Sequence, residues 1–189
     1  MRIVAGKWRG HTIFVPDIED TRPTMDRTRQ AVFNILRSAS FALNDNGVPL
    51  LHDAFVLDVF AGSGAMGFEA LSQGAAKAVF FENHPEAGRI IEKNRDKLHA
   101  GDTIKLMRGD VLKSGMNNST PANVAFFDPP YNKGLLEQSL LVLKEKNWID
   151  AKTILVLELH KKEDLAMDLE LFDSRIYGLS KVIFAKFLN

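Results

Sequence analysis

The feature that most constrains the fold is the glycine-rich segment Gly62-Ser63-Gly64-Ala65-Met66-Gly67. An apolar run with one acidic residue, Phe55-Val56-Leu57-Asp58-Val59, precedes it, and a helical pattern through Leu71 follows it. Glycines at this spacing permit a tight strand-to-helix turn and let the backbone approach a nucleotide closely. The segment therefore predicts a strand-turn-helix unit of the kind that holds a nucleotide-like ligand.

The rest of the chain repeats this alternation of strand and helix. We expect further buried strands at 78–81, 104–107, 124–127 and 154–157, and helices at 85–99 and 135–146. Continuous apolar strands alternating with helices indicate a doubly wound, mostly parallel α/β sheet. Two last strands, 174–177 and 182–185, are separated only by Gly178-Leu179-Ser180-Lys181. They predict an antiparallel C-terminal hairpin, which completes a seven-stranded sheet.

The first fifty residues differ in character from the rest. Residues 2–5 and 11–15 predict two short strands of a hairpin around Gly6-Lys7-Trp8-Arg9-Gly10. From about Asp26 a helix is expected, and Asn44-Asp45-Asn46-Gly47 should end it. Its apolar stripe comprises Ala31, Val32, Ile35, Leu36 and Ala39. We therefore divide the chain into an extension, residues 1–50, and an α/β domain, residues 51–189.

Three acidic residues identify the candidate ligand of the glycine turn. Glu82 follows Gly62 by twenty residues, as in a dinucleotide-binding fingerprint, so NAD is one candidate and a plain tight turn is another. Asp58, near the end of the first strand, would repel a pyrophosphate but favour the ammonium and sulfonium of S-adenosylmethionine. Asp110 could accept from an adenine amino group, although such residues often only form turns. All three map to the carboxyl ends of strands, where doubly wound sheets bind ligands.

The most specific motif is Asp128-Pro129-Pro130-Tyr131, directly after the fourth expected strand. The two prolines stiffen the backbone and push Asp128 toward extended geometry, so that its carboxylate and the following carbonyl are presented as acceptors. Two acceptors can hold both hydrogens of a nucleobase amine, a poor nucleophile, toward an activated methyl group. Tyr131 would stack on the base. The alternative is a rigid loop whose tyrosine covers the core.

Composition restricts the chemistry and the partners. The chain has no cysteine, which excludes disulfides, thiolate metal sites and cysteine nucleophiles. Basic and acidic side chains balance at 24 each, which argues against indiscriminate coating of nucleic acid. The scattered histidines have no metal-ligand spacing, so we expect no metal. No apolar run suits a membrane span and the N-terminus does not resemble a signal peptide, so we expect a cytoplasmic protein with no membrane contact.

Basic residues gather near an aromatic side chain in the extension, which suits contact with RNA phosphates and bases. A solvated helix face and a core-packed Trp8 are the structural alternatives. The candidate RNA-binding residues are Arg2, Lys7, Trp8, Arg9, Arg22, Arg27 and Arg29.

The chain resembles the bacterial guanine-N2 methyltransferases of small-subunit ribosomal RNA, the RsmD-like group. The Asp-Pro-Pro-Tyr and glycine motifs are shared with many amino methyltransferases, whereas two N-terminal segments narrow the resemblance to this family. The segments that carry it are Arg2 to Gly10, Arg22 to Leu36, Leu57 to Gly64, Asp128 to Tyr131 and Tyr177-Gly178. The family hairpin often has glycine and a stronger base where this chain has Ala5 and His11.

The resemblance implies a class I, Rossmann-like methyltransferase domain that uses S-adenosylmethionine on N2 of a guanine in 16S ribosomal RNA, in an assembling small subunit if the particle presents the target. It places the Asp-Pro-Pro-Tyr residues around the guanine, and a monomer is the default expectation. The expected cofactor-binding residues are Asp58, Ala61, Gly62, Ser63, Gly64, Glu82, Asn83, Asp110 and Val111.

Other functions stay open from the residues alone. The Asp-Pro-Pro-Tyr turn does not separate guanine N2 from adenine N6 of DNA or RNA. A protein glutamine-amide methyltransferase fits less well, because those enzymes resemble Asn-Pro-Pro-Tyr. A small NAD-dependent oxidoreductase would leave the proline turn unused, and a cofactor-free RNA-binding module would not need Asp58 or Glu82.

Overall fold

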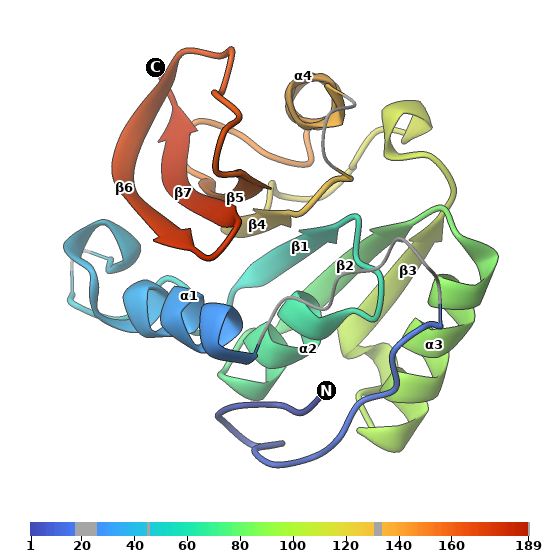
Figure 1. Ribbon diagram of the computed structural model, residues 1–189. Helices are drawn as coiled ribbons and strands as arrows, with labels where there is room; N and C mark the ends of the chain where they lie inside the picture. The colour runs from blue at the N-terminus through green and yellow to red at the C-terminus, as the bar shows by residue number, and fades with distance from the viewer. Residues whose placement is uncertain (18–25, 45, 131–133, 189) are drawn as a thin grey trace.

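The computed structural model describes residues 1–17, 26–44, 46–130 and 134–188. Its sheet contains seven strands in the order β3-β2-β1-β4-β5-β7-β6 (Figure 1). The strands are β1 (Phe55–Val59), β2 (Lys77–Glu82), β3 (Ile104–Arg108), β4 (Val124–Phe127), β5 (Ile154–His160), β6 (Leu169–Tyr177) and β7 (Ser180–Phe187). The helices are α1 (Asp26–Ser38), α2 (Ala65–Ser72), α3 (Pro85–Lys97) and α4 (Leu135–Glu145). Short 3₁₀ turns lie at Ser40–Ala42, Gly101–Thr103 and Val111–Lys113.

The pairing of the strands confirms the predicted fold class. Strands β3, β2, β1, β4 and β5 pair in parallel, whereas β7 pairs antiparallel with both β5 and β6. A parallel sheet extended by a C-terminal antiparallel hairpin is the architecture expected from the alternation of apolar strands and helices. The strand order reverses between β1 and β4, and the carboxyl ends of these parallel central strands lie at one common edge.

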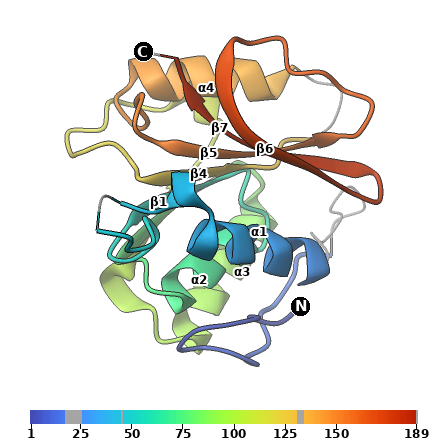
Figure 2. The ribbon, with the colours of Figure 1, turned by 90° about the vertical axis from the view of Figure 1, so that its left-hand side faces the viewer.

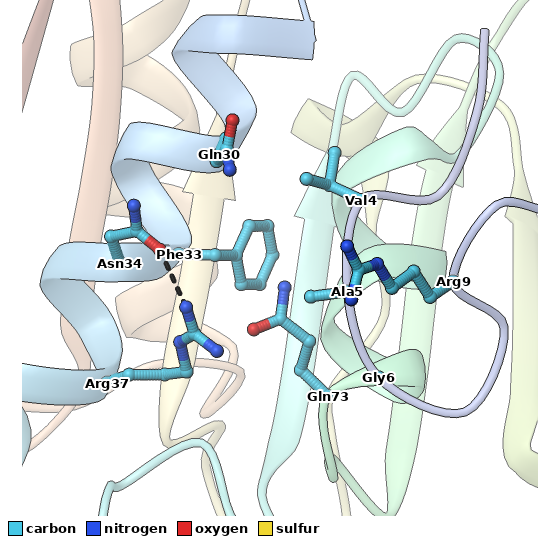
Figure 3. Close-up of a pocket in the computed structure, with 9 residues that line it drawn as sticks. All are labelled: Val4, Ala5, Gly6, Arg9, Gln30, Phe33, Asn34, Arg37 and Gln73. Carbon is cyan, nitrogen blue, oxygen red and sulfur yellow. Dashed lines mark hydrogen bonds between the residues drawn. The ribbon is translucent and has the colours of Figure 1, made fainter.

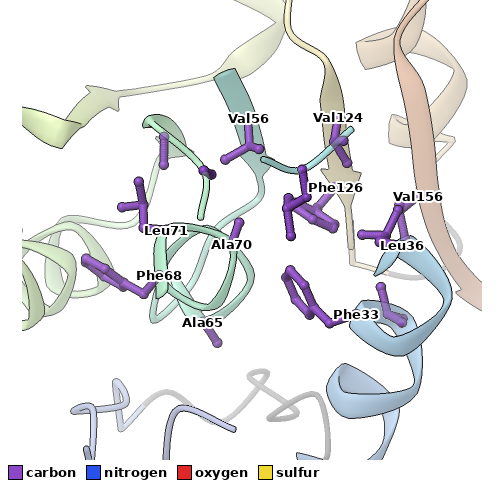
Figure 4. Close-up of a cluster of buried hydrophobic side chains, with 14 of the residues drawn as sticks. Phe33, Leu36, Val56, Ala65, Phe68, Ala70, Leu71, Val124, Phe126 and Val156 are labelled. Atoms are coloured by element: carbon purple, nitrogen blue, oxygen red, sulfur yellow. The ribbon is translucent and has the colours of Figure 1, made fainter. Parts of the chain in front are cut away.

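Helices cover both faces of the sheet, as Figure 2 shows: α1, α2 and α3 lie on one face and α4 on the other. Alternate residues of each strand point to opposite faces. Val56 and Phe126 thus join Phe33 of α1 and Phe68 of α2 in one buried cluster (Figure 4). Leu57 and its neighbours on the other face pack against α4.

The helix α1 differs from the prediction in its end and in its buried face. It ends at Ser38, ahead of the expected Asn44 boundary, and a 3₁₀ turn follows. Its buried residues are Thr28, Arg29, Val32, Phe33 and Leu36, whereas the predicted Ala31 and Ile35 are only half-buried. The buried face is shifted from the predicted stripe toward Phe33, whose ring packs on Phe126 of β4 with ring centroids 5.5 Å apart.

The first fifteen residues, here called the N-terminal arm, form a hairpin without regular strands. One antiparallel bridge joins Arg2 to Thr12, and the Ile3 amide donates to the His11 carbonyl at 2.9 Å. The arm departs from a strand because the amides of Val4 and Ala5 donate instead to the Glu69 carboxylate of α2, at 2.8 and 2.9 Å. The predicted hairpin is therefore present, but it is held by a helix.

Ile3 and Ile13 of the arm lie in the same buried cluster as Val56 and Phe126. The extension and the α/β domain therefore share one core. Within the described ranges, no helix is long and apolar enough to cross a membrane.

Candidate active site

The glycine segment forms the turn between β1 and α2. Gly62 and Gly64 have positive φ angles of 55° and 78°. A β-carbon at Gly64 would lie 2.8 Å from the Phe68 ring, and one at Gly67 would lie 2.4 Å from the Phe80 ring, so these two glycines permit close packing of helix on strand. A β-carbon at Gly62 would meet nothing within 4 Å. Gly62 therefore has a backbone conformation that favours glycine, and the space beside it is open. A ligand-binding turn requires both properties.

Asp58 lies beneath this turn and is 3% exposed. Its Oδ2 accepts from the Gly67 amide at 2.9 Å, which ties the end of β1 to the first turn of α2. Burial raises the pKa of Asp58 to about 7, the Gly67 hydrogen bond opposes the rise and the charge of Glu82 adds to it. A cation bound near this carboxyl would lower its pKa, because opposite charges favour the ionised form.

Glu82, at the end of β2, bonds to the glycine turn directly. Its Oε2 accepts from the Gly62 amide and its Oε1 from the His84 amide, each at 2.7 Å. A carboxylate has about four acceptor sites, so Glu82 retains capacity for a ligand hydroxyl. The Gly109 amide donates to the Glu82 carbonyl at 2.9 Å, which brings the end of β3 beside it.

Asp110 follows β3 and is exposed. Its Oδ1 accepts from the Leu112 amide at 3.0 Å and so caps the 3₁₀ turn that follows. This is the turn role considered from the sequence, and the carboxylate keeps acceptor capacity for another donor. Of the other expected cofactor-binding residues, Val111 and Ala61 are buried, Ser63 is half-buried and Asn83 is exposed.

The proline turn begins directly after β4, at the same edge of the sheet. Val59, Phe127 and Leu157 are in register across β1, β4 and β5. Asp128 therefore emerges beside the start of the glycine turn; it is half-buried, Pro129 is buried and Pro130 is exposed. The structure thus brings Asp128 to the same edge as Asp58, while Tyr131 lies outside the described residues.

Glu158 at this edge was not anticipated from the sequence. It follows Leu157 of β5 as Asp128 follows Phe127 of β4, so the two residues are neighbours across the strands. Burial raises the pKa of Glu158, and a hydrogen bond with Ser180 opposes the rise. The available signal was an acidic residue inside the apolar run Ile154–Leu159, because ionisable side chains in otherwise apolar strands are uncommon.

The prediction that Arg29 binds RNA is wrong. Arg29 is fully buried, with its Nε 3.3 Å from Glu69 Oε2 and its Nη2 2.9 Å from Asp26 Oδ1. It joins α1 to α2, and its guanidinium is not accessible to an RNA. Arg22 lies outside the described residues.

The other basic candidates are accessible. Arg2, Lys7, Arg9 and Arg27 are exposed. Trp8 is half-buried, with Lys7 Nζ 4.3 Å from its ring centroid. Among the residues the structure describes, no group of three histidine or acidic side chains is arranged to hold a metal ion.

Comparison with known proteins identifies the family. The family described as Conserved hypothetical protein 95 matches residues 1–186. Ribosomal RNA small subunit methyltransferase D of Escherichia coli is 36% identical over 158 residues, covering 84% of this chain and 74% of that protein. The chain belongs to the methyltransferase D family. The family member of Haemophilus influenzae is 35% identical over 169 residues, covering 87% of this chain and 81% of its own length.

Solved structures agree with this methyltransferase D assignment. The Escherichia coli protein yhhF, described as a candidate methyltransferase, superposes with a TM-score of 0.81 at 30% identity. The match covers 100% of this chain and 99% of that one. The seven-stranded sheet, the arm and α1 are therefore features of the family fold.

Proposed function

We propose that this chain transfers a methyl group from S-adenosylmethionine to the exocyclic N2 amine of a guanine in 16S ribosomal RNA. One observation carries the proposal: the Asp128-Pro129-Pro130 turn leaves β4 at the same sheet edge as the open Gly62 turn. A methyl donor in one turn and a base amine in the other would thus lie side by side. Membership of the methyltransferase D family supports the choice of reaction and of RNA.

The residues around the glycine turn fit S-adenosylmethionine. Gly62 leaves open space for it, and Glu82 and Asp110 keep acceptor capacity for ribose hydroxyls and the adenine amino group. Asp58 lies beneath the turn, and its ionised carboxylate, which a bound cation would favour, attracts a cationic ligand and repels an anionic pyrophosphate. When bound, S-adenosylmethionine supplies a methyl group already activated by its sulfonium.

Asp128 would then hold and orient the acceptor amine. Its carboxylate and the carbonyl that follows would each accept one N2 hydrogen, turning the nitrogen lone pair toward the methyl group. Because Pro129 is buried and both prolines restrict the backbone, this geometry would be set before the substrate arrives. Tyr131 would stack on the guanine, as its aromatic ring suits a base turned out of its helix.

Residues 1–50 would contact RNA while residues 51–189 carry the chemistry. The exposed Arg2, Lys7, Arg9 and Arg27 are the basic residues available for phosphates. The substrate would be 16S RNA within an assembling small subunit, because a chain with no net charge gains little affinity for RNA in general. We propose a monomeric, cytoplasmic enzyme.

Calorimetric titration with S-adenosylmethionine, S-adenosylhomocysteine and NAD tests the cofactor. We expect S-adenosylmethionine and S-adenosylhomocysteine to bind and NAD not to bind. Binding of NAD alone would overturn the methyltransferase mechanism and favour an oxidoreductase.

A further inference from the structure

Two adjoining cavities lie between the N-terminal arm and α1. The inner one has a volume of about 370 Å³ and the outer one about 390 Å³. Val4, Arg9 and Gln30 line both, so the cavities form one continuous depression, here called the arm–α1 groove. Figure 3 shows the inner cavity, with α1 on one side and the arm on the other.

The inner cavity of the groove lies away from the proposed methyl-transfer edge. Gln73, which lines the inner cavity, follows the last residue of α2, whereas the glycine turn precedes the first. The eight residues of α2 separate the two by about 12 Å, at ~1.5 Å per residue. The outer cavity is lined by Arg2 of the arm and by Asp26 and Arg27 at the start of α1, whereas the inner cavity reaches Arg37 in the last turn of α1.

The inner cavity is suited to an anion. Arg9 and Arg37 line it from opposite walls, and no acidic residue lines it. Arg37 Nη2 donates to the neutral amide oxygen of Asn34 at 2.6 Å. Within the described ranges neither arginine has a carboxylate partner. Glu69, beneath the cavity, is fully buried and already bound to Arg29 and to amides of the arm. Two guanidinium groups around one space favour a phosphate.

The inner cavity also contains an acceptor that lacks a hydrogen-bond donor. Gln73 Oε1 is buried and has no hydrogen-bond partner. Its amide cannot simply turn to solve this, because Gln73 Nε2 donates to Glu69 Oε1 at 2.7 Å. A phosphate oxygen is an acceptor and cannot satisfy another acceptor. A ribose hydroxyl or a base N–H can, once a shift of the Gln73 side chain exposes Oε1 to the cavity, and the cost of a buried acceptor without a partner favours such a ligand.

We propose that the arm–α1 groove is a subsite for an RNA nucleotide outside the one that is methylated. Its phosphate lies between Arg9 and Arg37, and its ribose hydroxyl or base N–H donates to Gln73 Oε1. The site anchors a flanking part of the substrate, and in this sense it rests on the proposed function. RNA fits better than an acidic peptide because Arg2 and Arg27 line the adjoining outer cavity, where they can contact the next phosphate of a continuous backbone.

Fluorescence anisotropy with a labelled uridine oligonucleotide and its 2′-deoxy counterpart, over a series of salt concentrations, tests the subsite. Arg9→Ala/Arg37→Ala should weaken RNA binding about tenfold or more and reduce the slope of log affinity against log salt by about 1. Lys152→Ala/Arg175→Ala removes the same charge from exposed positions elsewhere and should change neither quantity. Gln73→Met should leave the slope of log affinity against log salt unchanged. It should reduce the ratio of the affinity for the uridine oligonucleotide to the affinity for its 2′-deoxy counterpart.

Equal binding by the arginine variant and its control would overturn the subsite, and so would displacement of the RNA by polyglutamate as effective as by unlabelled RNA. An unchanged RNA preference in Gln73→Met would overturn the role of Gln73. Methyl transfer by the wild-type protein to small subunits is measured in parallel. Binding through the groove without transfer would contradict the proposed function alone, whereas transfer without use of the groove would contradict the subsite alone.

Discussion

Arg29 of α1 and Glu69 of α2 form an ion pair with 3.3 Å between Nε and Oε2, and both side chains are fully buried. Glu69 also accepts from the amides of Val4 and Ala5, and Arg29 Nη2 donates to the Arg2 carbonyl. The pair therefore fixes the N-terminal arm and α1 on α2. It explains how a chain segment without regular strands keeps a defined position beside the methyltransferase sheet.

Removing one partner of this pair should destabilise the protein strongly. Arg29→Met leaves the Glu69 carboxylate buried without its cation, which typically costs about 3–5 kcal/mol of unfolding free energy. Chemical denaturation measures the loss. The double variant Arg29→Met/Glu69→Gln should lose less than the sum of the single variants, because neither charge is then stranded. Strict additivity of the two single losses would contradict the coupling.

Arg29 also shows where prediction from the sequence stops. The strands of the sheet were predicted because buried parallel strands are continuously apolar, as in Val124–Phe127. The prediction of the buried face of α1 was wrong because the observed face includes Thr28 and Arg29, and a search for apolar residues does not find these two. The burial of Arg29 depends on its ion pair with Glu69, forty residues later, and no local sequence pattern reveals that partner. Strand β6 begins at Leu169, before the predicted Ser174, because an edge strand needs little apolar sequence.

In the candidate site, too, local sequence patterns predict some features, whereas others depend on contacts between distant segments. Asp58, Gly62, Glu82, Asp110 and Asp128 were predicted to lie at one edge because the ends of parallel strands meet there, and the structure places them so. Their roles with ligand and substrate stay predictions. The arm–α1 groove was not predicted, because it depends on how the arm packs against a helix.

The stability of the protein should depend on pH through Asp58. Its pKa is about 7 in the folded protein against an ordinary 3.8, so the folded state binds more protons than the unfolded state between these values. The contribution of Asp58 to stability is therefore complete below pH 3.8 and is lost as the pH rises through 7. Because a tenfold change in proton affinity corresponds to about 1.4 kcal/mol, the loss amounts to a few kcal/mol.

Asp58→Asn keeps an acceptor for the Gly67 amide but does not titrate. Its unfolding free energy should fall less steeply with rising pH than that of the wild type, because Glu158 still titrates, and denaturant titrations at several pH values give the comparison. Parallel pH profiles for the two proteins would show that Asp58 titrates normally.

Gly62 and Gly101 form a matched pair for the ligand site. Both have positive φ, 55° and 53°, and neither would bring a β-carbon within 4 Å of another atom. Alanine at either position should cost about 1–2 kcal/mol of stability through backbone strain. Only Gly62→Ala should also weaken S-adenosylmethionine binding, because only that position faces the proposed ligand. Equal affinities in both variants by calorimetry would remove Gly62 from the cofactor site.

Asp128→Ala should abolish methyl transfer while leaving affinity for S-adenosylmethionine close to that of the wild type. The loss follows because no carboxylate remains to hold the guanine amine, whereas the glycine turn is unchanged. Single-turnover transfer rates and calorimetry on the same preparation separate the two effects. Asp102→Ala, an exposed acid before β3, serves as the control. A wild-type rate in Asp128→Ala would end the proposed role of the proline turn.

Nucleoside analysis of small ribosomal subunits, taken from a strain that lacks its own family member, tests the proposed methyl transfer most directly. The purified protein and S-adenosylmethionine carrying a labelled methyl group are incubated with these subunits, and the 16S RNA is digested to nucleosides for mass spectrometry. We expect label in N2-methylguanosine at one position, and none with Asp128→Ala. Label in N6-methyladenosine, or no label in RNA at all, would contradict the proposed reaction.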